Sequence, residues 1–386
     1  MDRIHFVLGA GTYPHITGGM EIFNYYLIQS LKDKFNISYT ASRSLDIPDT
    51  KQIRSYKIRP TKYIFPIQLF FHLLFAKDAR KVVFSYSASH AILWNLYHKI
   101  CKLLNRKYYA VIHYGELPPK GQEEVYRRFF NNAEVVVAVS EDIKRNYDAK
   151  YGINCKVIYP LVPFSIAKLS KEDLKRKFQI PIKSNVICMV GSLKGMKNPD
   201  TIIEAIKLFT EEEKKNYSPY IVFAGDGVSI DSLKQKVTEC GLENCVTFLG
   251  NVPKEKVNEV YKLSDYYLIA SDFEGTSISL LEAMFNRKAI ITSRVPGIVN
   301  TITEGKECLM YDVKNATQLR QCLLSYLQHP ELANKLSSKA YDRYLHDYNY
   351  DNVVAEILKS LIPNFFGCIY NHRTTKTNQK YPSVNL

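Results

Sequence analysis

The sequence predicts an α/β protein with two domains, each built around a parallel sheet. Short apolar strands alternate with helical segments along nearly the whole chain, which is the pattern of parallel strands joined by crossover helices. A proline-rich segment near the middle interrupts this alternation. The length of 386 residues also fits two domains of ordinary size.

The first domain is expected over residues 1–162. It opens with RIHFVLGAG, an unbroken apolar run that predicts a buried strand. A turn containing Gly19 then leads into an amphipathic helix. A glycine-rich turn after a first strand suggests dinucleotide binding, but Pro14 stands where the third glycine of that fingerprint belongs. The sequence therefore argues against a nicotinamide cofactor.

Further strands follow, and ligands of such sheets collect beyond the carboxyl ends of the strands. His113 and Glu116 follow the strand KYYAVI at one such end. A single histidine after a strand is often structural. The expected divisions are an N-terminal domain at 1–162, a linker at 163–183, a C-terminal domain at 184–345, a helix returning to the first domain at 346–362 and an unstructured tail at 363–386.

The second domain contains the most informative stretch, SDFEGTSISLLEAM. It predicts a strand end, a polar turn with Glu274 and a helix that carries Glu282 about two turns in. The unpaired N–H groups at the start of a helix suit a phosphate, and a carboxylate suits vicinal hydroxyls. This chemistry favours a ligand that carries both a phosphate and vicinal hydroxyls. A capped amphipathic helix without a ligand would have the same sequence pattern.

The spacing Glu-x7-Glu within EGTSISLLEAM resembles the signature of family 4 of the retaining GT-B glycosyltransferases, also called glycosyl transferases group 1. The resemblance covers residues 1 to about 360 and is strongest over 186–313. It implies the GT-B fold, with two Rossmann-like domains facing a central cleft. It also implies metal-independent sugar transfer from a UDP- or GDP-linked donor to an acceptor hydroxyl, with retention of anomeric configuration.

The resemblance assigns roles to individual residues. Glu274, His113 and Lys197 are expected to be catalytic. Glu274 would lie beside the donor sugar, Lys197 on the diphosphate and Glu282 on the ribose. The expected donor-binding residues are Glu282, Gly275, Thr276, Ser277, Ile278, Lys194, Ser192, Gly19, Gly227, Asn251 and Val252.

The chain departs from the family pattern at three positions. Ser192 stands where the family has an arginine on the diphosphate, Asn300 where a glutamate is common, and Arg287 where glycine is usual. The loss of the arginine keeps a non-catalytic partner subunit open as an alternative. A nucleotide-sugar epimerase is another, and it would need His113 and Glu116 as its acid and base.

The net charge of +14 is concentrated in residues 1–160, which hold 23 Lys and Arg against 13 Asp and Glu. Residues 50–77 contain six basic and six aromatic residues and no acid, and their apolar part is too short to span a membrane. We expect this segment to touch an anionic membrane where a glycan or lipid-linked acceptor resides.

No motif supports nucleic-acid binding. The sequence shows no metal cluster or signal peptide, and its eight scattered cysteines predict a cytoplasmic protein, peripheral to the membrane at most.

Overall fold

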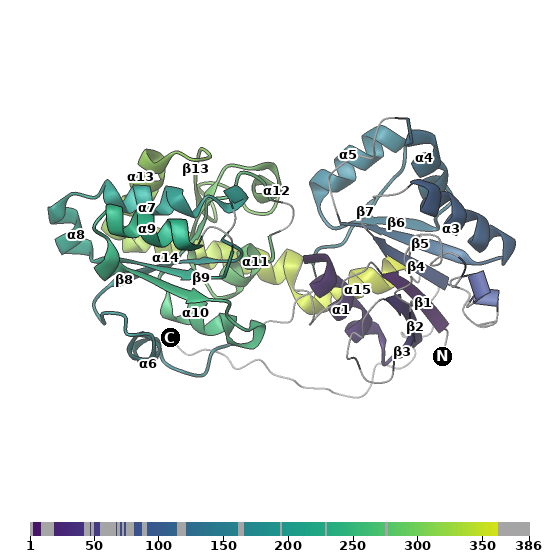
Figure 1. The fold of residues 1–386 in the computed structure, drawn as a ribbon, viewed down its shortest axis with the longest axis horizontal. Coiled ribbons are helices and arrows are strands. Elements are labelled where there is room, and N and C mark those ends of the chain that lie inside the picture. The colour runs from purple at the N-terminus through teal and green to yellow at the C-terminus, as the bar shows by residue number, and fades with distance from the viewer. Residues whose placement is uncertain are drawn as a thin grey trace.

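The computed structural model describes residues 3–8, 19–41, 47, 50–54, 67, 70–71, 73–74, 81–86, 91–113, 121–160, 166–193, 195–227, 230–274 and 277–361. The chain forms two lobes, and each lobe is a parallel sheet with helices on both faces (Figure 1). The predicted α/β class with two Rossmann-like lobes is therefore confirmed. Every helix within these ranges is too short or too polar to cross a bilayer.

Within the described ranges, the N-terminal sheet has the strand order β3-β2-β1-β4-β5-β6-β7, and all its pairings are parallel. Its strands are β1 (Arg3–Leu8), β2 (Asn36–Ala41), β3 (Lys51–Arg54), β4 (Lys81–Tyr86), β5 (Lys107–Ile112), β6 (Val135–Ala138) and β7 (Lys156–Val157). The helices of this lobe are α1 (Gly19–Leu31), α3 (Ala91–Leu103), α4 (Glu123–Asn131) and α5 (Glu141–Tyr151). The order changes direction between β1 and β4, so the crevice beyond their carboxyl ends is the expected ligand side.

The C-terminal sheet has the order β10-β9-β8-β11-β12-β13 and is also parallel over its described pairings. Its strands are β8 (Asn185–Val190), β9 (Pro219–Ala224), β10 (Val246–Gly250), β11 (Tyr266–Ile269), β12 (Ala289–Ser293) and β13 (Leu309–Tyr311). The helices are α6 (Lys171–Lys177), α7 (Pro199–Lys207), α8 (Glu211–Tyr217), α9 (Ile230–Glu239), α10 (Val257–Leu263), α11 (Ile278–Phe285), α12 (Pro296–Val299), α13 (Ala316–Gln328) and α14 (Pro330–Arg343), with short 3₁₀ turns at Gly195–Lys197, Glu243–Cys245 and Lys254–Lys256. Here the order changes direction between β8 and β11.

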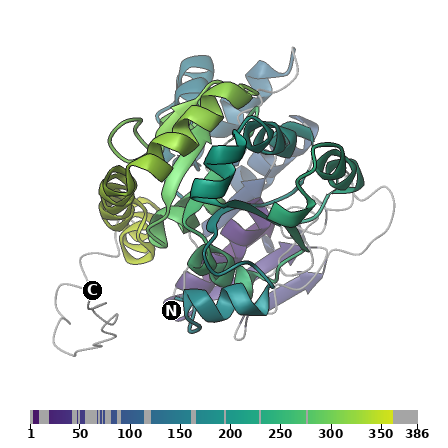
Figure 2. The same ribbon diagram turned by 90° about the vertical axis from the view of Figure 1, so that its left-hand side faces the viewer.

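Side chains of the C-terminal sheet alternate between two cores. On β8, Cys188 packs with α10, α11 and α14, whereas Ile187 and Met189 pack with α7, α9 and α13. Figure 2 views the molecule from the end of this lobe, which lies in front of the N-terminal lobe. The expected linker contains α6, and its Leu174 is part of the C-terminal core.

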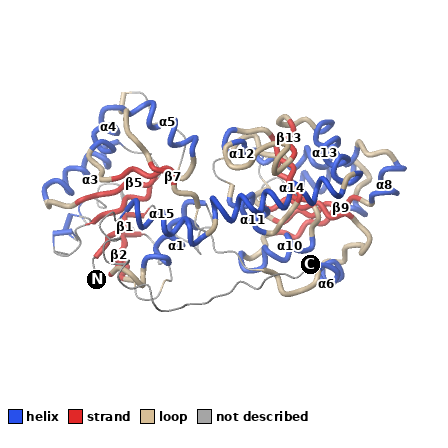
Figure 3. The backbone as a smooth tube through the Cα atoms, turned by 180° about the vertical axis from the view of Figure 1, so that it is seen from behind, coloured by secondary structure: helices blue, strands red, loops and turns tan. Residues whose placement is uncertain are grey.

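The chain passes between the two lobes twice, once between β7 and α6 and once between α14 and the last helix. After α14 the chain forms a π-helix at Tyr344–Tyr348 and then α15 (Tyr350–Leu361), which packs Val353 and Ile357 into the N-terminal core. Figure 3 shows α15 lying beside α1 and β1. Tyr159, just after β7, meets Tyr348 edge to face, with ring centroids 4.7 Å apart.

Two departures from the family pattern have a structural explanation. Arg287 has a φ of 53°, the left-handed region that favours glycine, and its guanidinium lies 3.9 Å above the ring of Tyr341. Asn300 ends α12 and accepts a hydrogen bond from Arg145 of α5 at 3.0 Å. Asn300 thus links the two lobes directly.

Candidate active site

Glu274 lies in the loop after β11, at the point where the strand order changes direction, and two groups hold its carboxylate. Lys197 Nζ donates to Oε1 at 2.5 Å, and the Ser271 hydroxyl donates to the same oxygen at 2.6 Å. The Glu274 side chain is 11% exposed and that of Lys197 is 30% exposed. Solvent therefore reaches this ion pair, and an incoming anion can compete with Glu274 for the lysine.

The loops after β8 and β11 are fixed to one another. The Asn198 side-chain amide donates to the Ala270 carbonyl at 3.1 Å and to the Asp272 carboxylate. The Asp272 backbone N–H donates to the Met196 carbonyl at 2.9 Å. These bonds hold Lys197 opposite Glu274, although the two residues are 77 positions apart. The exposed side chains of Met196 and Phe273 are their immediate neighbours in the chain.

Glu282 lies inside α11 and is more enclosed, with its side chain only 5% exposed. Lys254, at the start of the 3₁₀ turn after β10, donates to Oε1. The Tyr261 hydroxyl lies 2.9 Å from Oε2 and 3.0 Å from the Ser279 carbonyl. Burial, and then the nearby Glu282 carboxylate, raise the pKa of Tyr261 well above its usual value. The hydroxyl thus keeps its proton and donates it.

The start of α11 lies between the two acids in the sequence. Ser277 is its N-cap, and the Ser277 hydroxyl accepts from the Leu280 N–H at 3.4 Å. Ile278 is the first helical residue, so its N–H belongs to the group without an intrahelical partner. Gly275 and Thr276 lie outside the described residues.

Gly227 brings the loops after β8 and β9 into direct contact. A Cβ atom at Gly227 would lie 2.4 Å from the Leu193 carbonyl oxygen, and one at Gly225 would lie 1.8 Å from that of Gly191. Both positions need glycine because backbone occupies the space of a side chain. Packing alone explains these glycines, and donor binding by Gly227 stays a prediction.

Ser192 and the loop after β10 are the remaining described donor-binding candidates of this lobe. The Ser192 hydroxyl is buried and has no hydrogen-bond partner among the described residues. Asn251 is exposed, whereas Val252 is half-buried against the core on the α11 side of the sheet. Lys194 lies outside the described part of the chain.

His113 follows β5 in the N-terminal lobe and takes part in a short hydrogen-bond chain. Its Nε2 lies 2.7 Å from the Ser85 hydroxyl, which donates in turn to Asn24 Oδ1. Since the Ser85 proton is used on Asn24, Nε2 of His113 carries the hydrogen and Nδ1 is the acceptor. Burial lowers the pKa of His113 to about 3, so the ring is neutral at physiological pH.

The rest of the expected N-terminal site is only partly described. Gly19 is the first residue of α1, and Glu21 in its first turn is buried. Glu116, the proposed partner of His113 in an epimerase, lies outside the described residues, as does the tail at 363–386.

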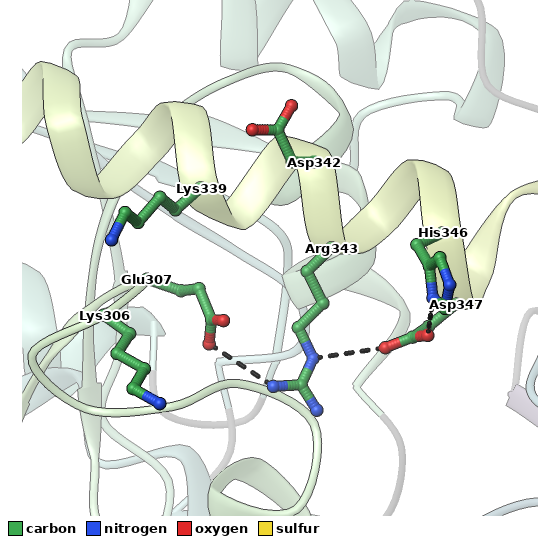
Figure 4. A pocket seen from close by; sticks show the side chains of 7 residues that line it. All are labelled: Lys306, Glu307, Lys339, Asp342, Arg343, His346 and Asp347. Atoms are coloured by element: carbon green, nitrogen blue, oxygen red, sulfur yellow. Dashed lines mark hydrogen bonds and ion pairs between the residues drawn. The ribbon is translucent and has the colours of Figure 1, made fainter.

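A hollow of about 400 Å³ lies elsewhere, between α14 and the loop before β13 (Figure 4). Arg343 crosses it and pairs with Glu307 at 3.4 Å and Asp347 at 3.5 Å. Neither Glu274 nor Glu282 lines it. Its lining residues are Lys306, Glu307, Lys339, Asp342, Arg343, His346 and Asp347.

Sequence reasoning missed several residues of the candidate active site around Glu274 and Glu282. Lys254 and Tyr261 hold Glu282, Ser271 holds Glu274, and no periodic pattern links them to the acids. One signal was available, since Lys254 lies two residues after Val252, which the resemblance assigns to donor binding.

Comparison with known proteins finds a family that the second lobe resembles. Residues 170–343 match the family of glycosyl transferases group 1. This range contains Lys197, Lys254, Glu274 and Glu282, and it begins just before α6. The match to this family therefore covers the cluster of acids and lysines at the carboxyl edge of the C-terminal sheet.

Two curated relatives are glycosyltransferases by name. An uncharacterised glycosyltransferase of Methanocaldococcus jannaschii is 27% identical over 60% of this chain and 58% of its own length. The putative teichuronic acid biosynthesis glycosyltransferase TuaC of Bacillus subtilis is 26% identical over 56% of this chain and 54% of its own length. The chain thus spans little more than half the length of these relatives.

Solved structures match nearly the whole chain. Anabaena HepE in complex with UDP covers 93% of this chain and 99% of its own, with a TM-score of 0.77 and 15% identity. A glycosyltransferase from Rickettsia africae covers 94% and 99%, with a TM-score of 0.79 and 20% identity. These likenesses establish the GT-B fold for both lobes.

Proposed function

We propose that the chain transfers a sugar from a nucleoside diphosphate sugar to an acceptor hydroxyl during assembly of a surface polysaccharide or a lipid-linked glycan, with retention of anomeric configuration. The observation that carries the proposal is the gathering of two acids, two lysines and a helix N-terminus at the switch point of the C-terminal sheet. These groups lie within the residues that match the glycosyl transferases group 1.

In the proposed mechanism the two acids bind different parts of the donor. Glu282 accepts hydrogen bonds from the ribose hydroxyls while Tyr261 and Lys254 hold its carboxylate in place. Glu274 orients the sugar and stabilises the positive charge that develops at the anomeric carbon. The contacts of Glu274 fall on Oε1, and Oε2 has no partner among the described residues. Oε2 is then the oxygen available to the sugar.

The departing diphosphate needs positive charge, which this chain can supply itself. Lys197 and the N-terminus of α11 lie near Glu274, and Lys254 lies near Glu282. Lys194 and the backbone N–H groups of Gly275 and Thr276 complete the proposed set. We therefore propose a metal-independent reaction in which transfer persists after dialysis against EDTA.

His113 is proposed to reach the donor sugar from the N-terminal lobe. The tautomer set by Ser85 leaves Nδ1 as an acceptor for a sugar hydroxyl, and the neutral ring adds no charge that would oppose the forming oxocarbenium ion. The proposed donors are UDP- or GDP-linked, and the proposed place of action is the cytoplasm.

A panel of UDP- and GDP-linked sugars tests this proposal with the purified full chain. A true donor at 100 times its dissociation constant adds about 2.7 kcal/mol to stability, which thermal unfolding detects. At the same donor concentration, Glu282→Gln should lose about half or more of this stabilisation, whereas Lys234→Gln, an exposed change on α9, should keep it. The donor that stabilises the protein is then incubated with acceptors, and NMR of the product gives its anomeric configuration.

Three outcomes would contradict the proposal. Conversion of the donor alone to its epimer would favour an epimerase. Stabilisation by a donor without transfer to any glycan acceptor would favour a non-catalytic subunit. A product of inverted configuration would exclude the retaining mechanism.

A further inference from the structure

We infer that the outer end of the N-terminal lobe docks on the surface of an anionic lipid bilayer through a patch that joins residues 67–74 to the C-terminal end of α3. The patch consists of Ile67, Phe71, Leu74 and Leu103, flanked by Lys99, Lys102 and Arg128. It differs from the expected 50–77 segment, because four of its seven residues come from α3 and α4.

The apolar part of the patch is one stripe of a helix. Ile67, Phe71 and Leu74 are helical residues spaced by four and three positions, so they lie on one face. Their exposed fractions are 56%, 50% and 40%. Leu73 is completely buried, which fixes the opposite face toward the core. The stripe therefore presents large apolar side chains to the surroundings.

Leu103 extends this stripe from a second element. It is the last residue of α3 and is 73% exposed. Arg106, three residues later, donates to the Leu73 carbonyl at 3.1 Å and so ties the end of α3 to the stripe. Four large apolar side chains from two elements thus gather at one end of the lobe.

Basic side chains surround this end. Lys99 and Lys102 on α3 and Arg128 on α4 are exposed. All three are close enough to His98 to lower its pKa, after burial as the main cause. An apolar stripe with a basic surround is complementary to the headgroup region of an anionic bilayer.

The position of the patch separates docking from the candidate active site. α3 ends near the amino end of β5, and His113 follows the carboxyl end of that strand. Six residues of strand put the two about 20 Å apart. Changes in the patch should therefore alter membrane binding and leave the active-site contacts unchanged.

The test is co-sedimentation of the full chain with vesicles. Vesicles of phosphatidylcholine are compared with vesicles of equal parts phosphatidylcholine and phosphatidylglycerol. We expect binding only to the anionic vesicles, with a loss at high salt because screening removes the contribution of the lysines. The double variant Phe71→Ser/Leu74→Ser should lower the bound fraction about tenfold, since it removes most of the apolar contact.

Matched variants keep the test decisive if that double variant is misfolded. Lys99→Gln/Lys102→Gln alters only exposed charges and should weaken binding, whereas Lys207→Gln/Lys234→Gln on the C-terminal lobe should not. Ile182→Ser is the control for loss of an exposed apolar side chain.

Three results would overturn the inference. They are absence of wild-type binding to anionic vesicles, equal binding by patch and control variants, and a dimer of the chain that the patch variants dissociate while vesicle binding is unchanged. The last result would assign the patch to a second copy of this chain. Vesicle binding does not require sugar transfer, so this inference can fail without affecting the proposed function.

Discussion

Glu274 and Glu282 have the same kinds of partner, one lysine and one hydroxyl each, but they lie in different surroundings. Glu274 is in a loop, its two contacts fall on one oxygen, and its lysine is 30% exposed. Glu282 is inside a helix, both of its oxygens are bonded, and one partner is a fully buried tyrosine. The difference indicates that Glu282 is a fixed part of the binding surface, whereas Glu274 can change partners during a reaction.

The largest expected effect is a loss of turnover in the Glu274→Gln variant. The amide keeps the shape of the side chain but removes the charge proposed to stabilise the transition state. We expect the kcat for sugar transfer to fall about 100-fold to 1,000-fold while the KM for the donor changes little. Initial rates at saturating donor measure this. A KM effect larger than the kcat effect would contradict the different roles of the two acids.

Glu282→Gln should act mainly on affinity. Loss of a charged acceptor for the ribose hydroxyls should weaken donor binding about 10-fold to 100-fold. Titration calorimetry with the donor measures this, with Glu259→Gln on α10 as the control. A normal dissociation constant with a low kcat would reverse the assigned roles.

Lys254→Met tests whether the Glu282 carboxylate depends on its lysine. The variant leaves a largely buried carboxylate without its cation and should lower the free energy of unfolding by about 1–3 kcal/mol. Urea unfolding measures the loss. The double variant Lys254→Met/Glu282→Leu should recover most of it, because no unpaired charge remains. Equal loss in the single and double variants would show that Lys254 stabilises the lobe in another way.

His113 should make stability depend on pH. Its pKa is about 3 in the folded chain and about 6.5 when unfolded, so the unfolded state binds more protons between these values. Stability is therefore complete above pH 6.5 and decreases as the pH falls toward 3, by about 1–2 kcal/mol at pH 5. His113→Asn should remove this part of the slope in urea unfolding at pH 7 and pH 5. An unchanged slope would mean that folding does not lower the pKa of His113.

The smallest effect is expected for Ser192→Ala. Its hydroxyl is buried without a partner among the described residues, so removal should change the stability of the free protein by no more than about 1 kcal/mol, toward greater stability. If the hydroxyl binds the donor phosphate, the KM for the donor should rise a few-fold. Thermal unfolding with and without donor distinguishes the two contributions. Clear destabilisation of the free protein would show that the hydroxyl has a partner.

The sequence predicted the fold well because strands and helices leave local periodic signals. The strand before Glu274 and the helix that carries Glu282 lie where the apolar pattern indicated. The partners of the acids could not be predicted in the same way. Lys254 contacts Glu282 because α10, which begins shortly after Lys254, packs against α11, and a contact across 28 residues leaves no local pattern.

The departures from the family show the same limit. Arg287 indicated a lost glycine, but only the backbone shows that the left-handed conformation is retained by a non-glycine residue. Asn300 indicated a lost glutamate, and its bond to Arg145 depends on how α5 of the first lobe meets α12 of the second. Such contacts follow from the tertiary arrangement rather than from the sequence near either residue.

The most direct test of the two-acid account compares the nucleoside diphosphate alone with the complete nucleotide sugar. The wild type, Glu274→Gln and Glu282→Gln are each titrated with both ligands in a calorimeter. We expect Glu282→Gln to weaken the binding of both ligands by the same factor, and Glu274→Gln to leave binding of the nucleoside diphosphate unchanged. Equal weakening of the nucleoside diphosphate by both variants would contradict it.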